Sequence, residues 1–167
     1  MLENERLTRF VQDGGASVKR SSWLLPPTIA VVAIAAMIVL HIFLPIAIVV
    51  RAPGSYTGAL LFAIGVAMVV WSRRAFQAVG TPIKPFTEST VLIRHGLYRW
   101  SRNPMYLGAV LLIAGVGIFL GSLGALVVVI AFFVILQHGF IRREERLLDE
   151  TFGERYRSYR RSVRRWL

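Results

Sequence analysis

The 167-residue chain contains no cysteine. This absence excludes disulfide bonds, thiolate catalysis and metal sites built on cysteine ligands. The three histidines, His41, His95 and His138, are too scattered along the sequence to form a recognisable zinc motif, so we expect no metal site. Charged residues are also scarce, at 17% against 55% hydrophobic residues. Soluble domains average about 25% charged residues, so we expect much of this surface to face lipid.

Acidic residues are few as well, at 9 against 20 lysines and arginines, which gives a net charge of +11. A basic protein could bind nucleic acid, but here the arginines flank the apolar runs instead of forming one continuous surface. The charge pattern therefore favours a membrane protein and no nucleic-acid partner.

Long uncharged runs predict about four transmembrane helices in an all-α, polytopic fold. A crossing needs about 20 apolar residues. The run from Met105 to Phe140 is too long for one crossing, and Gly121-Ser122-Leu123-Gly124 is its only plausible turn. The predicted transmembrane segments are residues 24–50, 52–72, 105–120 and 123–140.

Positive charge alternates along the chain and predicts its orientation. Four lysines and arginines precede residue 24, one lies at Arg51, six lie between Arg73 and Arg102, and nine follow Phe140. Positive loops stay on the cytoplasmic side, so both termini are predicted to be cytoplasmic, in a plasma (inner) membrane. One membrane domain of residues 1–167 results, with cytoplasmic segments at residues 1–23, 73–104 and 141–167.

Small residues recur every four positions in two of these segments. They are Ala59, Ala63 and Ala67, and then Gly117 and Gly121. This spacing allows close approach of helices in lipid, although alanine-rich membrane sequence without a special contact explains it equally well.

The C-terminal segment has amphipathic helical spacing. Its apolar residues follow one another at intervals of 4, 4, 3, 4 and 3 and alternate with arginines, and they are Leu148, Phe152, Tyr156, Tyr159, Val163 and Trp166. We expect a helix at the anionic membrane surface, with Gly153 as a possible break near its start.

Two polar clusters lie at the membrane boundary. Asn103-Pro104 is typical of a helix start, with its positive dipole end directed at the cytoplasmic interface. Glu144-Glu145 follows the last apolar run, and the hairpin brings both clusters to nearly the same depth. A helix start beside a carboxylate pair could bind the two ends of a zwitterion such as an amino-acid moiety. Ordinary capping and solvated interfacial charges are the alternatives.

Motifs in these clusters resemble those of the membrane methyltransferases that include isoprenylcysteine carboxyl methyltransferases and phospholipid methyltransferases. The resemblance covers roughly residues 80–166. It rests on Gly96-Leu97-Tyr98, Arg102-Asn103-Pro104-Met105-Tyr106-Leu107-Gly108, Glu144-Glu145, and Phe152-Gly153 followed by Tyr156 and Tyr159.

The resemblance implies S-adenosylmethionine as cofactor and a lipid or lipidated small molecule, entering from the bilayer, as methyl acceptor. Glu145 or His95 would serve as base if the acceptor is an ammonium, whereas a carboxylate needs none. The resemblance implies cofactor contacts from Leu92, Ile93, Tyr98, Asn103, Pro104, Met105, Tyr106 and Glu144.

Two departures leave the acceptor open. Isoprenylcysteine enzymes usually have histidine at the position of Asn103 and arginine at the position of Phe140. Two other functions are alternatives to a methyltransferase: a membrane reductase that uses NADPH, and a non-catalytic membrane protein of the same fold.

Overall fold

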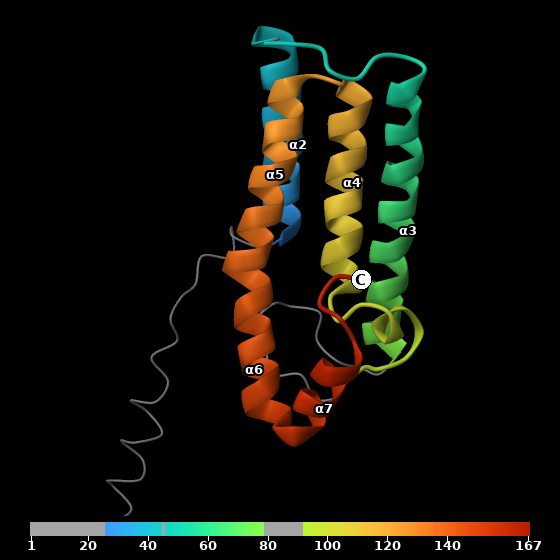
Figure 1. Cartoon of the computed structure of the whole chain (residues 1–167), viewed down its shortest axis with the longest axis vertical. Helices are drawn as coiled ribbons and strands as arrows, with labels where there is room; N and C mark the ends of the chain where they lie inside the picture. Colours follow the sequence, from blue (N-terminus) through green and yellow to red (C-terminus); the bar gives the residue numbers. More distant parts are fainter. Residues whose placement is uncertain (1–25, 45, 79–91) are drawn as a thin grey trace, which may run out of the picture.

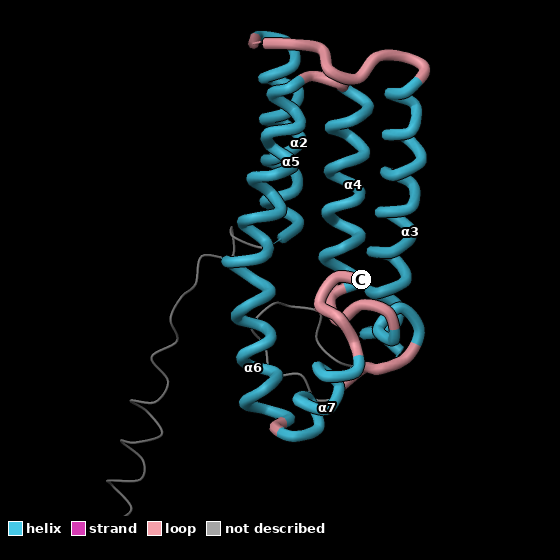
Figure 2. The backbone as a smooth tube through the Cα atoms, viewed as in Figure 1, coloured by secondary structure: helices cyan, strands magenta, loops and turns pink. Residues whose placement is uncertain are grey.

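The computed structural model describes residues 26–44, 46–78 and 92–167 (Figure 1). The expectations for residues 1–23 and 79–91 lie outside this part. Figure 2 shows helices joined by loops. The helices are α2 (Pro26–Phe43), α3 (Thr57–Ala78), α4 (Pro104–Leu120), α5 (Leu123–Ile135), α6 (Arg142–Phe152) and α7 (Glu154–Ser162), with 3-10 turns η1 (Gly54–Tyr56) and η2 (Gly96–Arg99) and a π-helical turn η3 (Leu136–Ile141).

Apolar helices form an elongated bundle in which α4 is central. It packs against α3 on one side and against α5 and α2 on the other (Figure 1). The helices at Pro26–Phe43, Gly54–Ala78 and Leu123–Phe152 are long and apolar enough to cross a membrane, and α4 is a shorter apolar helix of 17 residues. The all-α, polytopic fold predicted from the sequence is confirmed.

The first apolar segment is helical over less of its length than expected, because α2 ends at Phe43 and not near Val50. Proline at position 45 has no amide hydrogen with which to continue a helix. The chain beyond it pairs instead with the hairpin turn: Val49 N donates to Gly121 O at 2.8 Å, and Leu123 N donates to Ala47 O at 2.9 Å.

The hairpin between α4 and α5 turns where the sequence predicts. Gly121 ends α4 with φ of +69°, a conformation that favours glycine. A Cβ at this position would lie 2.0 Å from the carbonyl oxygen of Val50, so the close pairing with the preceding loop also requires glycine.

Four glycines allow α3 and α4 to pack with their backbones in contact. Gly58 faces Gly115, and Gly65 faces Gly108. Each pair is seven residues apart along its own helix, so this contact differs from the expected four-residue pattern. Ala59, Ala63 and Ala67 are exposed on the other side of α3, because the glycines occupy the contact face.

We expect Gly65→Ala to destabilise the bundle by about 3 kcal/mol. The added Cβ would lie 2.4 Å from the backbone nitrogen of Leu112 and 2.6 Å from the carbonyl oxygen of Gly108, and neither atom can rotate away. Denaturant unfolding in detergent micelles measures the change. Gly139→Ala is the matched control, because nothing lies within 4 Å of a Cβ there. Equal unfolding midpoints for the two variants would contradict the proposed backbone contact.

The C-terminal segment consists of two helices and a returning tail. α6 continues the α5 helix through η3. Gly153, with φ of +51°, reverses the chain into α7. Tyr156 and Tyr159 are buried against the rest of the protein, at 1% and 5% exposure. The amphipathic face predicted from the sequence therefore packs on this protein, while the arginines beside the tyrosines are exposed, namely Arg155, Arg157, Arg160 and Arg161.

Candidate functional site

The two polar clusters meet at one end of the bundle, where α3 ends and α4 begins, which we call the polar end. The α5–η3–α6 helix passes this end, and the C-terminus returns to lie beside the start of α4 (Figure 1). The predicted equal depth of the clusters is confirmed by two contacts. Tyr106 Oη donates to Glu144 Oε1 at 2.9 Å, and Arg102 Nη2 lies 2.9 Å from Glu145 Oε1.

The π-helical turn η3 determines which way the two glutamates face. One extra residue in a helical turn rotates everything after it by about 100°, and such turns often occur at functional sites. Leu136, Phe140 and Ile141 of this turn are all buried against the bundle. The turn thereby directs Glu144 towards α4 while the next residue, Glu145, faces the C-terminal tail.

Glu144 is a half-buried carboxylate among tyrosines. Tyr106, its hydrogen-bond donor, is 8% exposed, and Tyr98 is close enough to interact with Glu144 electrostatically. A partly buried carboxylate that accepts a hydrogen bond from a tyrosine is suited to binding a cationic group such as an ammonium.

Glu145 is occupied by ion pairs. Its Oε2 lies 2.5 Å from Arg165 Nη2, and its Oε1 accepts from Arg165 Nε at 3.1 Å as well as from Arg102. The side chains of Glu145 and Arg102 are only 8% and 7% exposed. Glu145 therefore joins the start of α4 to the C-terminal tail, and this contact leaves neither oxygen free.

The C-terminal tail closes over the start of α4 through main-chain contacts. Arg102 N donates to Arg164 O at 3.0 Å, and Ser101 Oγ donates to Arg165 O at 3.2 Å. Trp166 contacts α5 and η3. Its Nε1 donates to Gln137 Oε1 at 3.1 Å, and its ring centroid lies 5.1 Å from that of Phe133. The sequence predicts only amphipathic spacing for Trp166 and not these contacts.

α4 starts at the predicted Asn103-Pro104 pair, but the Asn103 side chain does not cap the helix as expected. Pro104 occupies the first helical turn, and Asn103 stands at the N-cap position without capping the helix through its side chain. Its Nδ2 donates to Arg165 O at 3.3 Å instead. The first-turn amides of α4 therefore have no side-chain cap among the described residues, which leaves this helix end suited to a carboxylate.

Tyr98 is fixed between α3 and α7. Its carbonyl accepts a 2.6 Å hydrogen bond from Tyr159 Oη, and its ring packs edge-on against Phe76 at 5.8 Å. Burial raises the pKa of Tyr98 above its ordinary value and the pKa of Tyr159 to about 12. Both phenols therefore stay protonated at neutral pH and act as hydrogen-bond donors.

The other residues proposed from the sequence lie at the same end with fewer contacts. Ile93 is buried, whereas Leu92 and Met105 are half-buried. His95 is exposed just before η2 and lies at the rim of a cavity.

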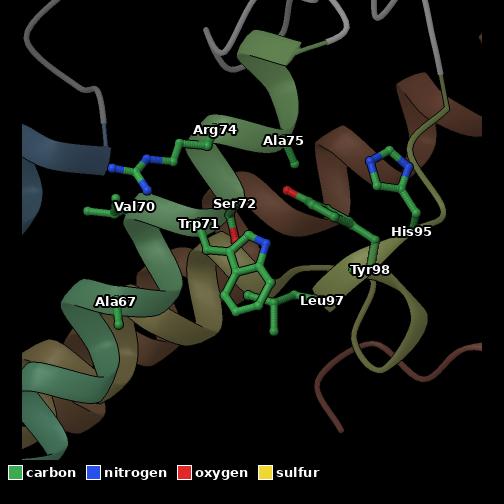
Figure 3. Close-up of a pocket in the computed structure, with 10 residues that line it drawn as sticks. Ala67, Val70, Trp71, Ser72, Arg74, Ala75, His95, Leu97 and Tyr98 are labelled. Atoms are coloured by element: carbon green, nitrogen blue, oxygen red, sulfur yellow. The ribbon is translucent and has the colours of Figure 1, made fainter.

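This cavity of about 610 Å³ opens between the last turns of α3 and η2 (Figure 3). Gly96, with φ of +61°, makes the turn that brings η2 against α3. Tyr98 forms part of the wall, so the cavity adjoins the Glu144 cluster. Sequence reasoning missed the α3 side of the site, because Trp71, Ser72 and Arg74 belong to an apolar helix with no motif.

Fold and site together define an integral membrane protein with a polar site at one end of an apolar helical bundle. A model of the phospholipid methyltransferase family matches residues 54–155, more than half of the chain. The chain therefore belongs to this family of membrane methyltransferases.

Two other proteins are similar to this chain. An uncharacterized protein from Haemophilus influenzae is 40% identical over 63 residues, which are 38% of this chain and all of that protein. The structure of the eukaryotic intramembrane Ras methyltransferase ICMT (isoprenylcysteine carboxyl methyltransferase) matches with a TM-score of 0.59 at 22% identity. That match covers 90% of this chain and 54% of the ICMT chain, so this chain spans about half the length of its structural relative.

Proposed function

We propose that this protein transfers a methyl group from S-adenosylmethionine to a lipid or lipidated acceptor in the membrane. The observation that carries the proposal is the half-buried Glu144 carboxylate, which accepts a hydrogen bond from Tyr106 one turn into a helix whose start has no side-chain cap. The two features offer opposite charges a short distance apart. They suit the ammonium and the carboxylate of an amino-acid moiety.

The described residues offer a partner for each charged group of the cofactor's amino-acid part. Glu144 and Tyr98 would hold its ammonium side, and the amides of Met105 and Tyr106 would hold its carboxylate. Leu92, Ile93, Asn103 and Pro104 would complete the binding surface. S-adenosylmethionine supplies a methyl carbon on a sulfonium sulfur, and the electron pair of the breaking carbon–sulfur bond stays on sulfur.

The chain's own contribution is alignment and exclusion of water, which can supply a large part of the rate enhancement in a displacement reaction. The C-terminal tail keeps Arg102 and the start of α4 in place through Glu145 and Arg165. We therefore assign Glu145 a positioning role and not the role of a base. His95, exposed at the cavity rim, is the remaining residue that could accept a proton from an ammonium acceptor.

The distribution of lysines and arginines predicts how the protein is oriented in the membrane. The polar end carries most of the lysines and arginines of the chain. We place it and both termini on the cytoplasmic side of the plasma (inner) membrane, where S-adenosylmethionine is available to the site.

The test is methyl transfer by the protein purified in nanodiscs. With S-adenosylmethionine labelled at the methyl group, we expect label to enter a lipid fraction, and S-adenosylhomocysteine to bind in calorimetry. A folded protein that binds neither cofactor form would refute the proposal. Binding of NADPH in their place would favour a reductase, and binding of no cofactor would favour a non-catalytic protein.

A further inference from the structure

The start of α4 is covered on all the residues that introduce it. Ser101 and Asn103 are only 1% and 8% exposed, and Pro104 is fully buried. The proposed function puts the carboxylate of the cofactor beside these residues, and a charged cofactor arrives from water. One of the segments that cover the start of α4 therefore has to move when the cofactor binds or leaves. The C-terminal tail, residues 163–167, is the segment whose contacts suit this movement.

Polar contacts join the tail to the three residues before Pro104. Arg164 O accepts a hydrogen bond from Arg102 N at 3.0 Å. Arg165 O accepts two more, from Ser101 Oγ at 3.2 Å and from Asn103 Nδ2 at 3.3 Å. Water can replace such hydrogen bonds when a segment opens, so a segment held mainly by them opens more readily than a packed apolar helix.

Glu145 has two cationic partners, and only one of them belongs to the tail. The Arg165 side chain is 30% exposed, whereas the Arg102 side chain is 7% exposed and lies directly before α4. When the tail opens, Arg165 moves into water and Arg102 stays beside the carboxylate. No buried carboxylate is then left without a counter-charge, so the large penalty for breaking a buried ion pair does not arise.

The tail is joined to a helix that is itself held firmly. Tyr156 and Tyr159 of α7 are 1% and 5% exposed, and Tyr159 Oη donates to the carbonyl of Tyr98 at 2.6 Å. Val163 N donates to Tyr159 O at 3.0 Å and closes the last turn, and Val163 itself has extended backbone, with φ of −126° and ψ of 133°. Val163 is therefore the hinge about which the tail can move while α7 stays in place.

Trp166 holds the far end of the tail. Its half-buried ring packs beside Phe133, and its Nε1 donates to Gln137 Oε1. Leu167, the next residue, is 72% exposed. One aromatic side chain thus fixes this end of the tail to the α5–η3 helix.

We infer that the C-terminal tail is a gate for the cofactor. It closes over the start of α4, is held by Trp166 and Arg165, and rotates away about Val163 to admit or release S-adenosylmethionine. The inference deepens the proposed function and rests on it for the identity of the molecule admitted. It also explains why Glu145 is paired with two arginines. The competing entrance is the cavity between α3 and η2.

The test locks the tail in its closed position. The chain has no cysteine, so Gln137→Cys combined with Trp166→Cys introduces the only two thiols. A short thiol-specific crosslinker that a reductant cleaves joins them. Compared with the same protein after cleavage, the locked protein should bind and release labelled S-adenosylhomocysteine at least about tenfold more slowly, because a gate closed over both the empty and the filled site slows both directions. Its affinity should stay within about threefold, and ligand added before locking should be trapped.

Asp149→Cys combined with Arg157→Cys is the matched control. These side chains meet at 3.0 Å and link α6 to α7 without involving the tail. The crosslinker should leave exchange in this protein within about twofold of the uncrosslinked rate, since α7 stays in place when the gate opens.

Equal exchange rates in the locked and cleaved forms of the Gln137 and Trp166 variant would assign entry to the cavity beside η2 and overturn the inference. Equal slowing in the control would overturn it too, because the movement would then involve α7 and not the tail alone. A parent that binds no S-adenosylhomocysteine would refute the proposed function and the gate with it, so the two failures are distinguishable.

Discussion

Replacing Glu144 with alanine should lower the affinity for S-adenosylhomocysteine at least about 30-fold, a loss of about 2 kcal/mol. Hydrogen bonds to charged groups contribute about 1.5–3 kcal/mol, and Glu144 is the described carboxylate that faces the start of α4 without a cationic side chain paired to it. Without it the ammonium of the bound molecule would be buried with no counter-charge. Calorimetry on the parent and the variant measures the change.

Glu150→Ala is the matched control, because Glu150 lies on the same helix, is exposed, and should leave affinity within about twofold of the parent. Tyr106→Phe keeps the carboxylate and removes only its 2.9 Å hydrogen bond, so we expect an intermediate loss. If Glu144→Ala and Glu150→Ala bind S-adenosylhomocysteine equally, Glu144 does not contact the cofactor and the proposed geometry is wrong.

The meeting of the two polar clusters could be predicted from the sequence because strong local signals determine it. Gly121 ends α4 at the expected turn, and the helical rise then places Asn103 and Glu144 at similar depths. The positive φ of Gly121 and the uncharged runs on either side leave little choice of register. The contact between Tyr106 and Glu144 follows from that register.

Other parts of the site depend on packing that no single segment encodes. The π-helical turn η3 has only Gly139 as a local cue, yet it directs Glu144 and Glu145 to different neighbours. Glu145 is a plausible base when its sequence position alone is considered. Its role changes once the tail brings Arg165 back across 20 residues of sequence.

The α3 side of the site was also beyond sequence reasoning. Trp71 lies in the segment predicted only as a membrane crossing, and Arg74 was predicted to lie in the cytoplasmic segment that follows. Both belong to α3, which extends to Ala78, and they line a cavity because Gly96 turns η2 against them. Similarly, the glycines at the contact between α3 and α4 are seven residues apart along each helix, so a search for small residues every four positions did not find them. In both cases the neighbouring segment, η2 or α4, determines which side of α3 forms the contact.

The buried charge cluster at Glu145 should be the part of this end most sensitive to mutation. Glu145→Ala leaves the Arg102 guanidinium buried, at 7% exposure, with its acidic partner removed. Removing one member of a buried ion pair costs about 3–5 kcal/mol, since the remaining charge keeps its desolvation penalty. We expect a loss of this size in denaturant unfolding, together with release of the tail from the start of α4.

Asp149→Ala provides the control on the same helix. Asp149 pairs with Arg157 at 3.0 Å, but that pair is exposed, at 57% for the arginine side chain, and exposed pairs contribute about 0–1 kcal/mol. Limited trypsin digestion then separates positioning from general stability, because a released tail exposes the peptide bonds after Arg164 and Arg165. In Glu145→Ala these bonds should be cut at temperatures where the bundle is still folded, and in Asp149→Ala they should stay protected. Equal stability and equal protection in the two variants would show that the tail is held by Trp166 and its main-chain contacts and not by Glu145.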